Sequence, residues 1–267
     1  MSLSPVTFPS CSRLSCIEAA NDTILLMPSH MPAGYRGQWH QHSKGQLIYP
    51  RQGRYRVYTR QQVWIGSPRR ACWIPHGIEH TVWAIEALDI HNVYMKEVSS
   101  TTLLPHECRQ VPVMPLLEEL LLFGTSLNTA DNALPLKSHT LALIAELIHM
   151  AYHSSIPTLP LAANRQVRKI MDELLSDPAD NRRLEEWALI THCSERTLAR
   201  HFHTHAGMSF SQWRQRLRAI EAVARLESGH PIKQVACDLG YASQSAFTAM
   251  FHRTVGCCPS LFKTAAI

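Results

Sequence analysis

The sequence predicts an α+β chain of more than one domain, with a β-barrel-like N-terminal part that also carries helices and an all-α C-terminal part. Two observations predict this division. Residues 20–100 contain short β-branched and aromatic runs separated by Gly and Pro, whereas apolar residues recur at helical spacing from about Met114 onward. The last hundred residues also carry one helix-turn-helix pattern twice. A chain of 267 residues is long enough to bury two cores.

The N-terminal part is predicted to be a β-sandwich or barrel. Its short runs alternate or are continuously apolar, as half-buried and buried strands are, and the turns between them contain Gly or Pro. The expected strands cover residues 46–49, 54–59 and 72–74, and the expected turns lie at residues 53, 66–68 and 75–77.

Two helices are predicted between the β-rich part and the C-terminal helices. The first is marked by Leu residues over 116–121 and is expected to end near Gly124, and the second covers 136–152. One apolar stripe of the second helix is long enough to cover a partner helix in a dimer, or to pack on the protein's own barrel. That stripe consists of Leu141, Ile144, Leu147 and Ile148. Residues 154–160 are expected to be a linker.

The C-terminal part carries two predicted helix-turn-helix units. The first has helices at 184–192 and 195–202, and the second has helices at 232–240 and 244–251, with Ser194 and Ser243 as N-caps of the second helices. One long helix over 209–228 is expected to join them. Because the second helix of such a unit enters the major groove, two units in one chain predict contact with two successive groove segments.

Polar side chains on the outer faces of these second helices are the candidate DNA-binding residues. They are Glu195, Arg196, Arg200, Gln244, Ser245 and Thr248. Arg can bond two guanine acceptors and Gln can bond adenine, although a phosphate contact is equally open for each. Residues 161–267 hold 14 Lys and Arg against 10 Asp and Glu, so most of the net charge of +5 lies in this part. That excess suits a phosphate-binding surface.

The C-terminal hundred residues resemble the AraC/XylS family of bacterial transcription regulators. The departures are Val255 and Cys258, where the family usually has Phe and Thr. The resemblance implies a regulator that binds double-stranded operator DNA as a homodimer, with RNA polymerase as a further partner. The residues that match in order and spacing are Ser194, Arg196, Thr197, Leu198, Arg200, Phe202, Gly207, Ser209, Trp213, Arg214, Ile232, Val235, Ala236, Gly240, Tyr241, Ser243, Ser245, Phe247, Phe251, Gly256 and Pro259.

The N-terminal part resembles the cupin fold that many such regulators use as a sensor. Gly34, His40-Gln41-His42, Gln46 and Gly53 reproduce the first cupin motif, with Gln46 in place of the usual glutamate, and residues 75–80 reproduce the second. The resemblance implies that His40, His42, Gln46 and His80 meet inside the barrel. Two His at i and i+2 of a strand lie on one face, because side chains alternate.

This constellation leaves two kinds of ligand open. Three imidazoles suit Zn, Ni, Fe or Cu, but an amide is a poorer ligand than the usual carboxylate, so no cofactor is required. Otherwise the histidines bond an organic effector or a buried network. The expected effector-binding residues are Trp39, His40, His42, Gln46, Tyr49, Trp73 and His80, and the expected metal ligands are His40, His42, His80 and Gln46.

The leading hypothesis is a transcription regulator controlled by a small-molecule effector, and not an enzyme. It divides the chain into a cupin-like effector-sensing domain (1–112), a helical dimerisation or linker region (113–160) and a DNA-binding domain (161–267). The alternative is a metal-dependent cupin enzyme of dioxygenase or isomerase type fused to a DNA-binding tail. Against it, no acidic ligand and no general acid/base pair accompany the histidines. A purely architectural DNA binder would leave these residues without a role.

Composition points to the cytoplasm. The sequence has no run of 18 apolar residues, which excludes a membrane-spanning helix, and its first residues lack the basic and apolar regions of a signal peptide. Eight scattered Cys with no CxxC pair predict reduced thiols.

Overall fold

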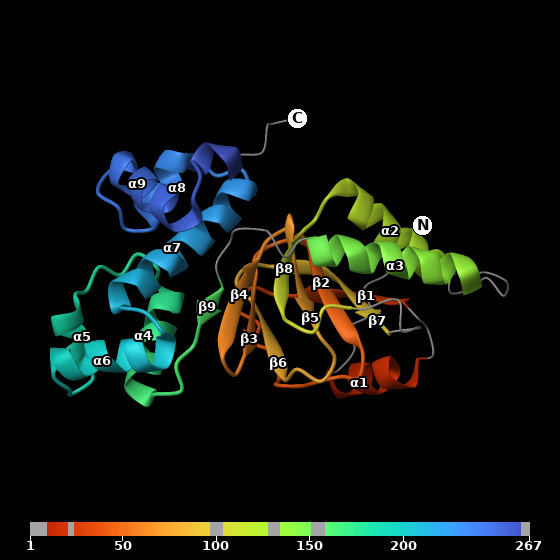
Figure 1. Ribbon diagram of the computed structural model, residues 1–267, viewed down its shortest axis with the longest axis horizontal. Helices are drawn as coiled ribbons and strands as arrows, with labels where there is room; N and C mark the ends of the chain where they lie inside the picture. The colour runs from red at the N-terminus through yellow and green to blue at the C-terminus, as the bar shows by residue number, and fades with distance from the viewer. Residues whose placement is uncertain (1–9, 21–23, 97–103, 128–133, 151–157, 263–267) are drawn as a thin grey trace. The chain divides into compact units, whose positions relative to one another are not determined.

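The computed structural model describes residues 10–20, 24–96, 104–127, 134–150 and 158–262, so part of the predicted linker (154–157) lies outside the described residues. The chain forms two compact units (Figure 1). Unit 1 comprises residues 1–59 and 66–154, and unit 2 comprises residues 60–65 and 155–267. No helix among the described residues combines the length and apolar character needed to cross a bilayer.

Unit 1 is built on a five-stranded antiparallel sheet in the order β1-β7-β2-β5-β8. Its strands are β1 (Ile24–Met31), β2 (Gly45–Gln52), β5 (Arg70–Ile74), β7 (Leu88–Met95) and β8 (Arg109–Pro112). A second antiparallel pair is formed by β3 (Tyr55–Thr59) and β6 (His80–Ala84). These strands include the three predicted from the sequence, and Gly53 and Gly77 have the positive φ angles that their turns require.

The register of β2 decides which side chains share a face of the sheet. Gln46 lies opposite Tyr94 of β7, whereas Leu47 lies opposite Val93 of β7 and Trp73 of β5. Because side chains alternate along a strand, Gln46 and Tyr94 project from one face and Leu47 and Trp73 from the other.

Helices α2 (Pro115–Ser126) and α3 (Leu134–Met150) cover the Leu47 face of the sheet (Figure 1). Side chains of the sheet and of both helices form one buried core cluster. The core members from the two helices are Leu117, Leu121, Leu141, Ile144, Ala145 and Ile148. Burial of this apolar area is the main force that holds the helices on the sheet.

The first helix ends at Ser126, two residues past Gly124, so its expected end near Gly124 is confirmed. Gly124 itself lies where the helix approaches β1. A Cβ at Gly124 would lie 2.8 Å from Cδ1 of Ile24. The sequence left two arrangements open for the apolar stripe, and the structure shows the one in which it packs on the protein's own sheet. Leu141, Ile144 and Ile148 are buried there, and Leu147 is partly buried against the same cluster.

Unit 2 is helical apart from one short ladder between β4 (Gln62–Gly66) and β9 (Leu159–Pro160). Its helices are α4 (Arg165–Ser176), α5 (Leu184–Ile190), α6 (Glu195–Ala206), α7 (Phe210–Glu227), α8 (Ile232–Asp238) and α9 (Gln244–Val255). A short 3-10 helix, Pro259–Phe262, follows α9. The predicted fold class, β-rich then all-helical, is confirmed.

The caps of unit 2 explain where its helices begin and end. The Ser194 side chain accepts a hydrogen bond from the Thr197 amide, and Ser243 does the same for Ala246, as expected of N-caps. The left-handed φ angles expected for Gly207 and Gly240 are present, at 69° and 77°. The predicted joining helix over 209–228 is α7, with Ser209 and Ser228 as its caps.

Candidate functional site

Three imidazoles converge between the two sheets of unit 1. The ligand nitrogens of His40, His42 and His80 all lie within 4.8 Å of one another. The ring centroids of His40 and His80 are 4.4 Å apart, and those of His42 and His80 are 5.1 Å apart. His80 begins β6, and a backbone bridge holds His40 beside it. The predicted convergence of these three residues is therefore confirmed.

Gln46 reaches the same point from β2, as the motif predicted. Its Oε1 lies 2.9 Å from Nε2 of His42 and 3.0 Å from Nε2 of His80. Its Nε2 donates to Oδ1 of Asn92 at 2.9 Å and to the Tyr94 hydroxyl at 3.2 Å. Both partners come from β7, so a hydrogen-bonded row of side chains fixes the amide.

The other ring nitrogen of each histidine faces a backbone carbonyl two residues away. The carbonyl partners of Nδ1 are Gln38 for His40, Lys44 for His42 and Ile78 for His80. A carbonyl can only accept, so each Nδ1 carries the proton and each Nε2 keeps a lone pair. Metal-ligating histidines are oriented in this way.

Burial keeps the His42 and His80 side chains uncharged. It lowers the pKa of His80 to about 3 and lowers the pKa of His42 below its ordinary value. Neutral imidazoles with free Nε2 lone pairs are the form that binds a transition metal. The donor set of three imidazole nitrogens and one amide oxygen therefore fits Zn, Ni or Fe.

Two of the remaining predicted effector residues lie away from the histidine cluster. Tyr49 and Trp73 are buried in the core cluster on the Leu47 face, away from Gln46, so they do not line the histidine cluster. Alternation along β2 and β5 is the physical reason. Trp39 precedes His40 and is 37% exposed.

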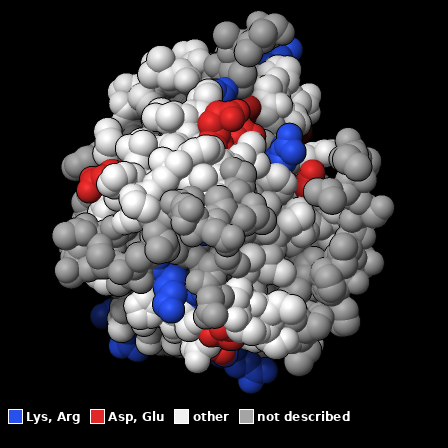
Figure 2. Space-filling model, turned by 90° about the vertical axis from the view of Figure 1, so that its right-hand side faces the viewer, with Lys and Arg blue, Asp and Glu red and all other residues white. Residues whose placement is uncertain are grey.

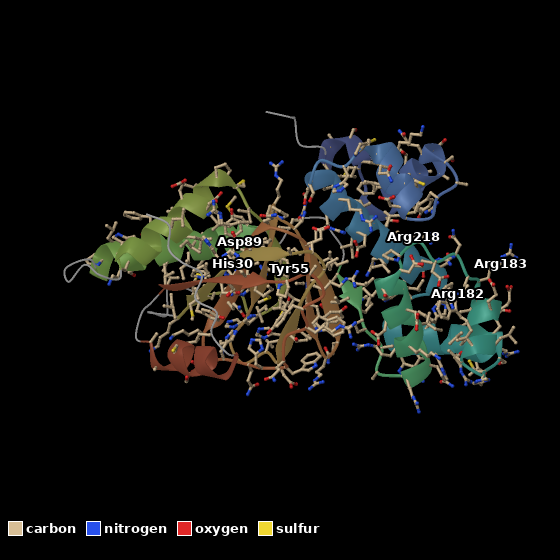
Figure 3. All side chains as sticks on the ribbon, turned by 180° about the vertical axis from the view of Figure 1, so that it is seen from behind. His30, Tyr55, Asp89, Arg182, Arg183 and Arg218 are labelled. Atoms are coloured by element: carbon tan, nitrogen blue, oxygen red, sulfur yellow. The ribbon has the colours of Figure 1, made fainter. Side chains whose placement is uncertain are left out.

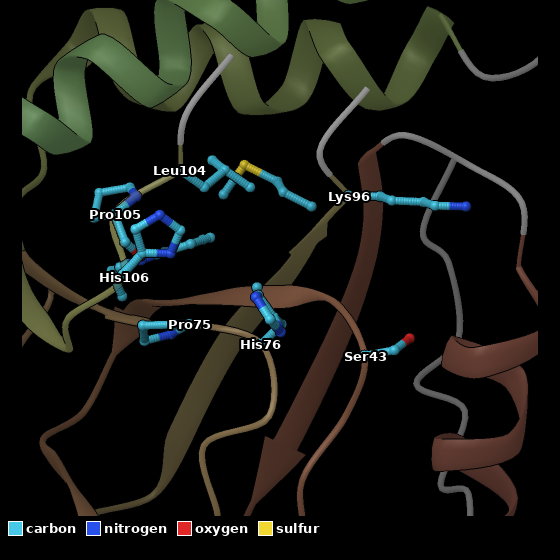
Figure 4. A pocket seen from close by; sticks show the side chains of 10 residues that line it. Ser43, Pro75, His76, Lys96, Leu104, Pro105 and His106 are labelled. Atoms are coloured by element: carbon cyan, nitrogen blue, oxygen red, sulfur yellow. The ribbon is translucent and has the colours of Figure 1, made fainter. Parts of the chain in front are cut away.

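Trp73 instead lines a separate cavity of about 170 Å³ in unit 1. The imidazoles of His76 and His106 face into this cavity, while the Lys96 side chain leads away from it (Figure 4). Gly45 forms part of the wall, and its missing Cβ leaves room for the Trp73 ring. The cavity and the histidine cluster thus share the short segment from His42 to Gln46.

That segment is tied to the N-terminal helix α1 (Ser10–Ala19). The backbone amide of Ser43 donates to the Glu18 carboxylate at 2.7 Å, and its hydroxyl donates to the other carboxylate oxygen. The buried Lys44 ammonium donates to the carbonyls of Ile17 and Ala20, at the C-terminal end of the helix. A displacement of His42 would therefore change the hydrogen bonds that Ser43 and Lys44 make with α1.

In unit 2 the predicted DNA-binding side chains lie on exposed surfaces of α6 and α9. Glu195, Arg196 and Arg200 are exposed on α6, and Gln244 and Ser245 are exposed on α9, with Thr248 partly exposed. The apolar faces of the same helices are buried, with Leu198 and Phe202 on α6 and Phe247 and Phe251 on α9. Whether these polar residues touch DNA stays a prediction.

A buried arginine links the two helix-turn-helix units. Arg218 of α7 donates to the carbonyls of Pro178 and Asp180 at 2.7 and 2.9 Å and to Oδ1 of Asn181 at 3.0 Å. Asn181 in turn donates to the Gly240 carbonyl in the turn of the second unit, at 3.0 Å. Figure 3 labels Arg218 together with Arg182 and Arg183, which precede α5. The loop that precedes the first helix-turn-helix is thereby held against the turn of the second helix-turn-helix.

Sequence reasoning missed several of these residues. Asn92 and Tyr94 orient Gln46, yet they lie in a strand without a recognisable motif, and only the register brings them to β2. No strand was predicted over residues 88–95, so alternation along that segment was the one signal that could have found them.

The comparisons with known proteins agree with unit 2. Residues 187–265 match the model of a helix-turn-helix domain family. The HTH-type transcriptional regulator NimR of Escherichia coli K12 is 30% identical over 223 residues, which cover 84% of this chain and 81% of NimR. The chain belongs to the AraC/XylS family of transcriptional regulators.

Further relatives of this AraC/XylS-family regulator share shorter segments or only distant likeness. RipA of Corynebacterium glutamicum, another HTH-type transcriptional regulator, is 42% identical over 112 residues, 42% of this chain and 34% of RipA. Among solved structures, ToxT of Vibrio cholerae is 12% identical with a TM-score of 0.39, over 90% of this chain and 98% of ToxT. The DNA-binding domain of AdpA, in complex with a target DNA, is 25% identical with a TM-score of 0.34, over 35% of this chain and 86% of that domain.

Proposed function

We propose that this regulator binds double-stranded operator DNA through α6 and α9 and that occupancy of the histidine cluster sets its activity. The observation that carries the proposal is the convergence of His40, His42, His80 and Gln46, with each Nδ1 facing a carbonyl. Because the proposed partner is operator DNA, we propose that the protein acts in the cytoplasm, with RNA polymerase as a further partner at the promoter.

The proposed primary ligand of the cluster is a divalent transition metal, Zn, Ni or Fe. The three Nε2 atoms and Oε1 of Gln46 would hold it, and the ion would act as a Lewis acid toward a small-molecule effector. His40 is partly exposed, whereas His42 and His80 are buried, so the effector would approach from the His40 side. The described metal-binding group contains no carboxylate, which favours sensing over turnover.

A ligand can shift the protein between two states only if it binds one of them better than the other. The segment from His42 to Gln46 offers a physical route within unit 1, because Ser43 and Lys44 fasten it to α1. Movement of the cluster side chains would change the position of α1. That change is the proposed first step of the response.

We also propose that the active form is a homodimer paired through the outer face of α3. Leu136, Leu143 and Met150 are seven residues apart and exposed, and Met150 is 69% exposed. A repeat of seven residues matches one position of the coiled-coil heptad. On the face that Figure 2 shows, the described Lys, Arg, Asp and Glu side chains form separate small patches among residues of other kinds. Sedimentation should show that Leu143→Arg converts a dimer to a monomer while Lys137→Gln does not.

The sensing proposal is tested with the full chain, purified without an affinity tag. Elemental analysis should find about one Zn, Ni or Fe per chain in the wild type and almost none in His80→Gln. The control is His76→Gln, whose imidazole lies outside the cluster. DNA binding measured by gel shift should then change on chelation in the wild type and not in His80→Gln. Equal metal content in His80→Gln and the wild type would contradict the proposed site.

A further inference from the structure

The caps of α6 and α9 are related by a constant offset along the chain. The N-caps Ser194 and Ser243 are 49 positions apart, and so are the left-handed C-caps Gly207 and Gly256. The same offset relates His203 of α6 to His252 of α9. A histidine therefore occupies the same position, in the last turn, of both recognition helices.

Both histidines lie on the predicted DNA-facing side of their helices. His203 follows Arg200 by three residues and Arg196 by seven, and His252 follows Thr248 by four and Ser245 by seven. Residues at these spacings share one helix face. Both histidines are exposed.

We infer that His203 and His252 bind DNA phosphates and take up protons as they do so, which makes the affinity for DNA depend on pH. The inference rests on the proposed DNA binding by α6 and α9 and names two further contact residues there. It concerns the sugar-phosphate backbone, since a histidine at the end of a recognition helix lies beyond the residues at the start that reach base edges.

The charged groups on neighbouring helices leave both imidazoles available. Helices α4, α5 and α7 pack against α6, and α7, α8 and the 3-10 helix pack against α9. Several of their charged side chains are engaged with other groups, and none of the described ion pairs includes His203 or His252. The engaged pairs are Arg168 with Asp172, Glu186 with the Arg183 amide, Arg214 with the Arg182 carbonyl, Arg225 with Glu221 and Asp238, and Arg253 with Gln215. Arg216 and Arg218 of α7 donate to backbone carbonyls. The other charged side chains of these helices are Arg165, Lys169, Glu173, Glu185, Glu227 and Lys233 on the neighbours, and Glu195, Arg196, Arg200, His201 and His205 on α6.

The sign of the effect follows from linkage. A phosphate beside an imidazole favours its charged form, so the complex holds more protons than the free protein. Affinity must then rise as the pH falls through the range in which histidine changes charge, pH 8 to 5. Each protonated contact also neutralises one phosphate and steepens the dependence on salt.

The experiment uses the full chain and a double-stranded DNA of fixed, arbitrary sequence, because phosphate contacts do not depend on sequence. We expect binding roughly tenfold tighter at pH 6 than at pH 8 at constant ionic strength. The slope of log K against log salt should be steeper at pH 6 by about 1 to 2. In the double variant His203→Gln/His252→Gln, both differences should nearly vanish.

Two further variants separate charge from structure. The double variant His203→Lys/His252→Lys carries fixed charges and should bind at pH 8 as tightly as the wild type binds at pH 6. His205→Gln, an exposed histidine two residues from His203 and so on another face of α6, is the control and should retain the pH dependence. The inference is overturned if His203→Gln/His252→Gln keeps the wild-type pH dependence, or if the wild type shows none. Failure to bind any DNA at either pH would instead refute the proposed function.

Discussion

The Nε2 atom of His80 lies 3.0 Å from Oε1 of Gln46, at the meeting point of β6 and β2. With each Nδ1 proton directed at a carbonyl, this contact joins two lone pairs, and Nε2 of His42 adds a third at 2.9 Å. A cation bound between these three atoms would be coordinated by a lone pair from each of them. The same heavy atoms admit one other proton arrangement, in which the amides of Gln46 and Asn92 are reversed and the Gln46 amide donates to both imidazoles.

Gln46→Glu distinguishes these two arrangements. A carboxylate supplies the charged ligand that Gln46 lacks, so we expect affinity for Zn²⁺ to rise about tenfold or more, which is about 1.4 kcal/mol. Without metal the buried carboxylate has lost the amide's donors, so the apo variant should unfold at a lower temperature than the wild type. Thermal unfolding with and without Zn²⁺ measures both effects. If Zn²⁺ stabilises neither protein, the metal-free arrangement is correct.

Gly45→Ala should destabilise unit 1 by about 1–3 kcal/mol. A Cβ at this position would lie 2.1 Å from the Trp73 ring, whose Nε1 is fixed by a hydrogen bond to the Pro105 carbonyl. Urea unfolding gives the loss of stability. In the background of Trp73→Leu, which removes the ring, the same substitution should cost much less; an equal cost there would mean that the ring is not the obstacle.

Arg218→Met should weaken unit 2 by roughly 3 kcal/mol, because it leaves the carbonyls of Pro178 and Asp180 and the Asn181 amide oxygen without a donor. Loss of this link should also make the separation between the two DNA segments protected in a footprint less well defined. Arg253→Met removes an exposed arginine from α9 and serves as the control for a general loss of charge. A footprint that stays sharp in Arg218→Met would show that the link does not set the spacing.

Arg196→Ala should relax the sequence preference over one groove segment and leave the segment read by Gln244 unchanged. A direct contact to guanine contributes about 1–3 kcal/mol of discrimination. Footprinting on operator variants measures the change for each segment separately. An equal loss of affinity on operator and random DNA would instead assign Arg196 to a phosphate.

The sequence by itself determined unit 2 almost completely. Its helices, N-caps and turns follow from local signals, such as Ser194 before α6 and Gly207 after it, and capping is decided within a few residues of the chain. The convergence of His40, His42 and His80 also followed from sequence, because the two motifs carry it. Three strands of unit 1, β2, β3 and β5, were predicted because apolar runs and Gly or Pro turns mark them, whereas β1, β6, β7 and β8 were not.

Only the tertiary structure decided which face of each strand and helix is buried and which element that face packs against. Tyr49 and Trp73 are aromatic residues close in sequence to the histidine motifs, yet the pairing of β2 with β5 and β7 places them under α2 and α3. Helical spacing put Leu141 in an apolar stripe and left Leu143 out of it, but only the structure showed that this stripe packs on the sheet, where Leu141 is buried while Leu143 is 44% exposed. Register and packing join residues far apart in the chain, such as Gln46 with Asn92 and Arg218 with Asn181, and no local pattern encodes such pairs.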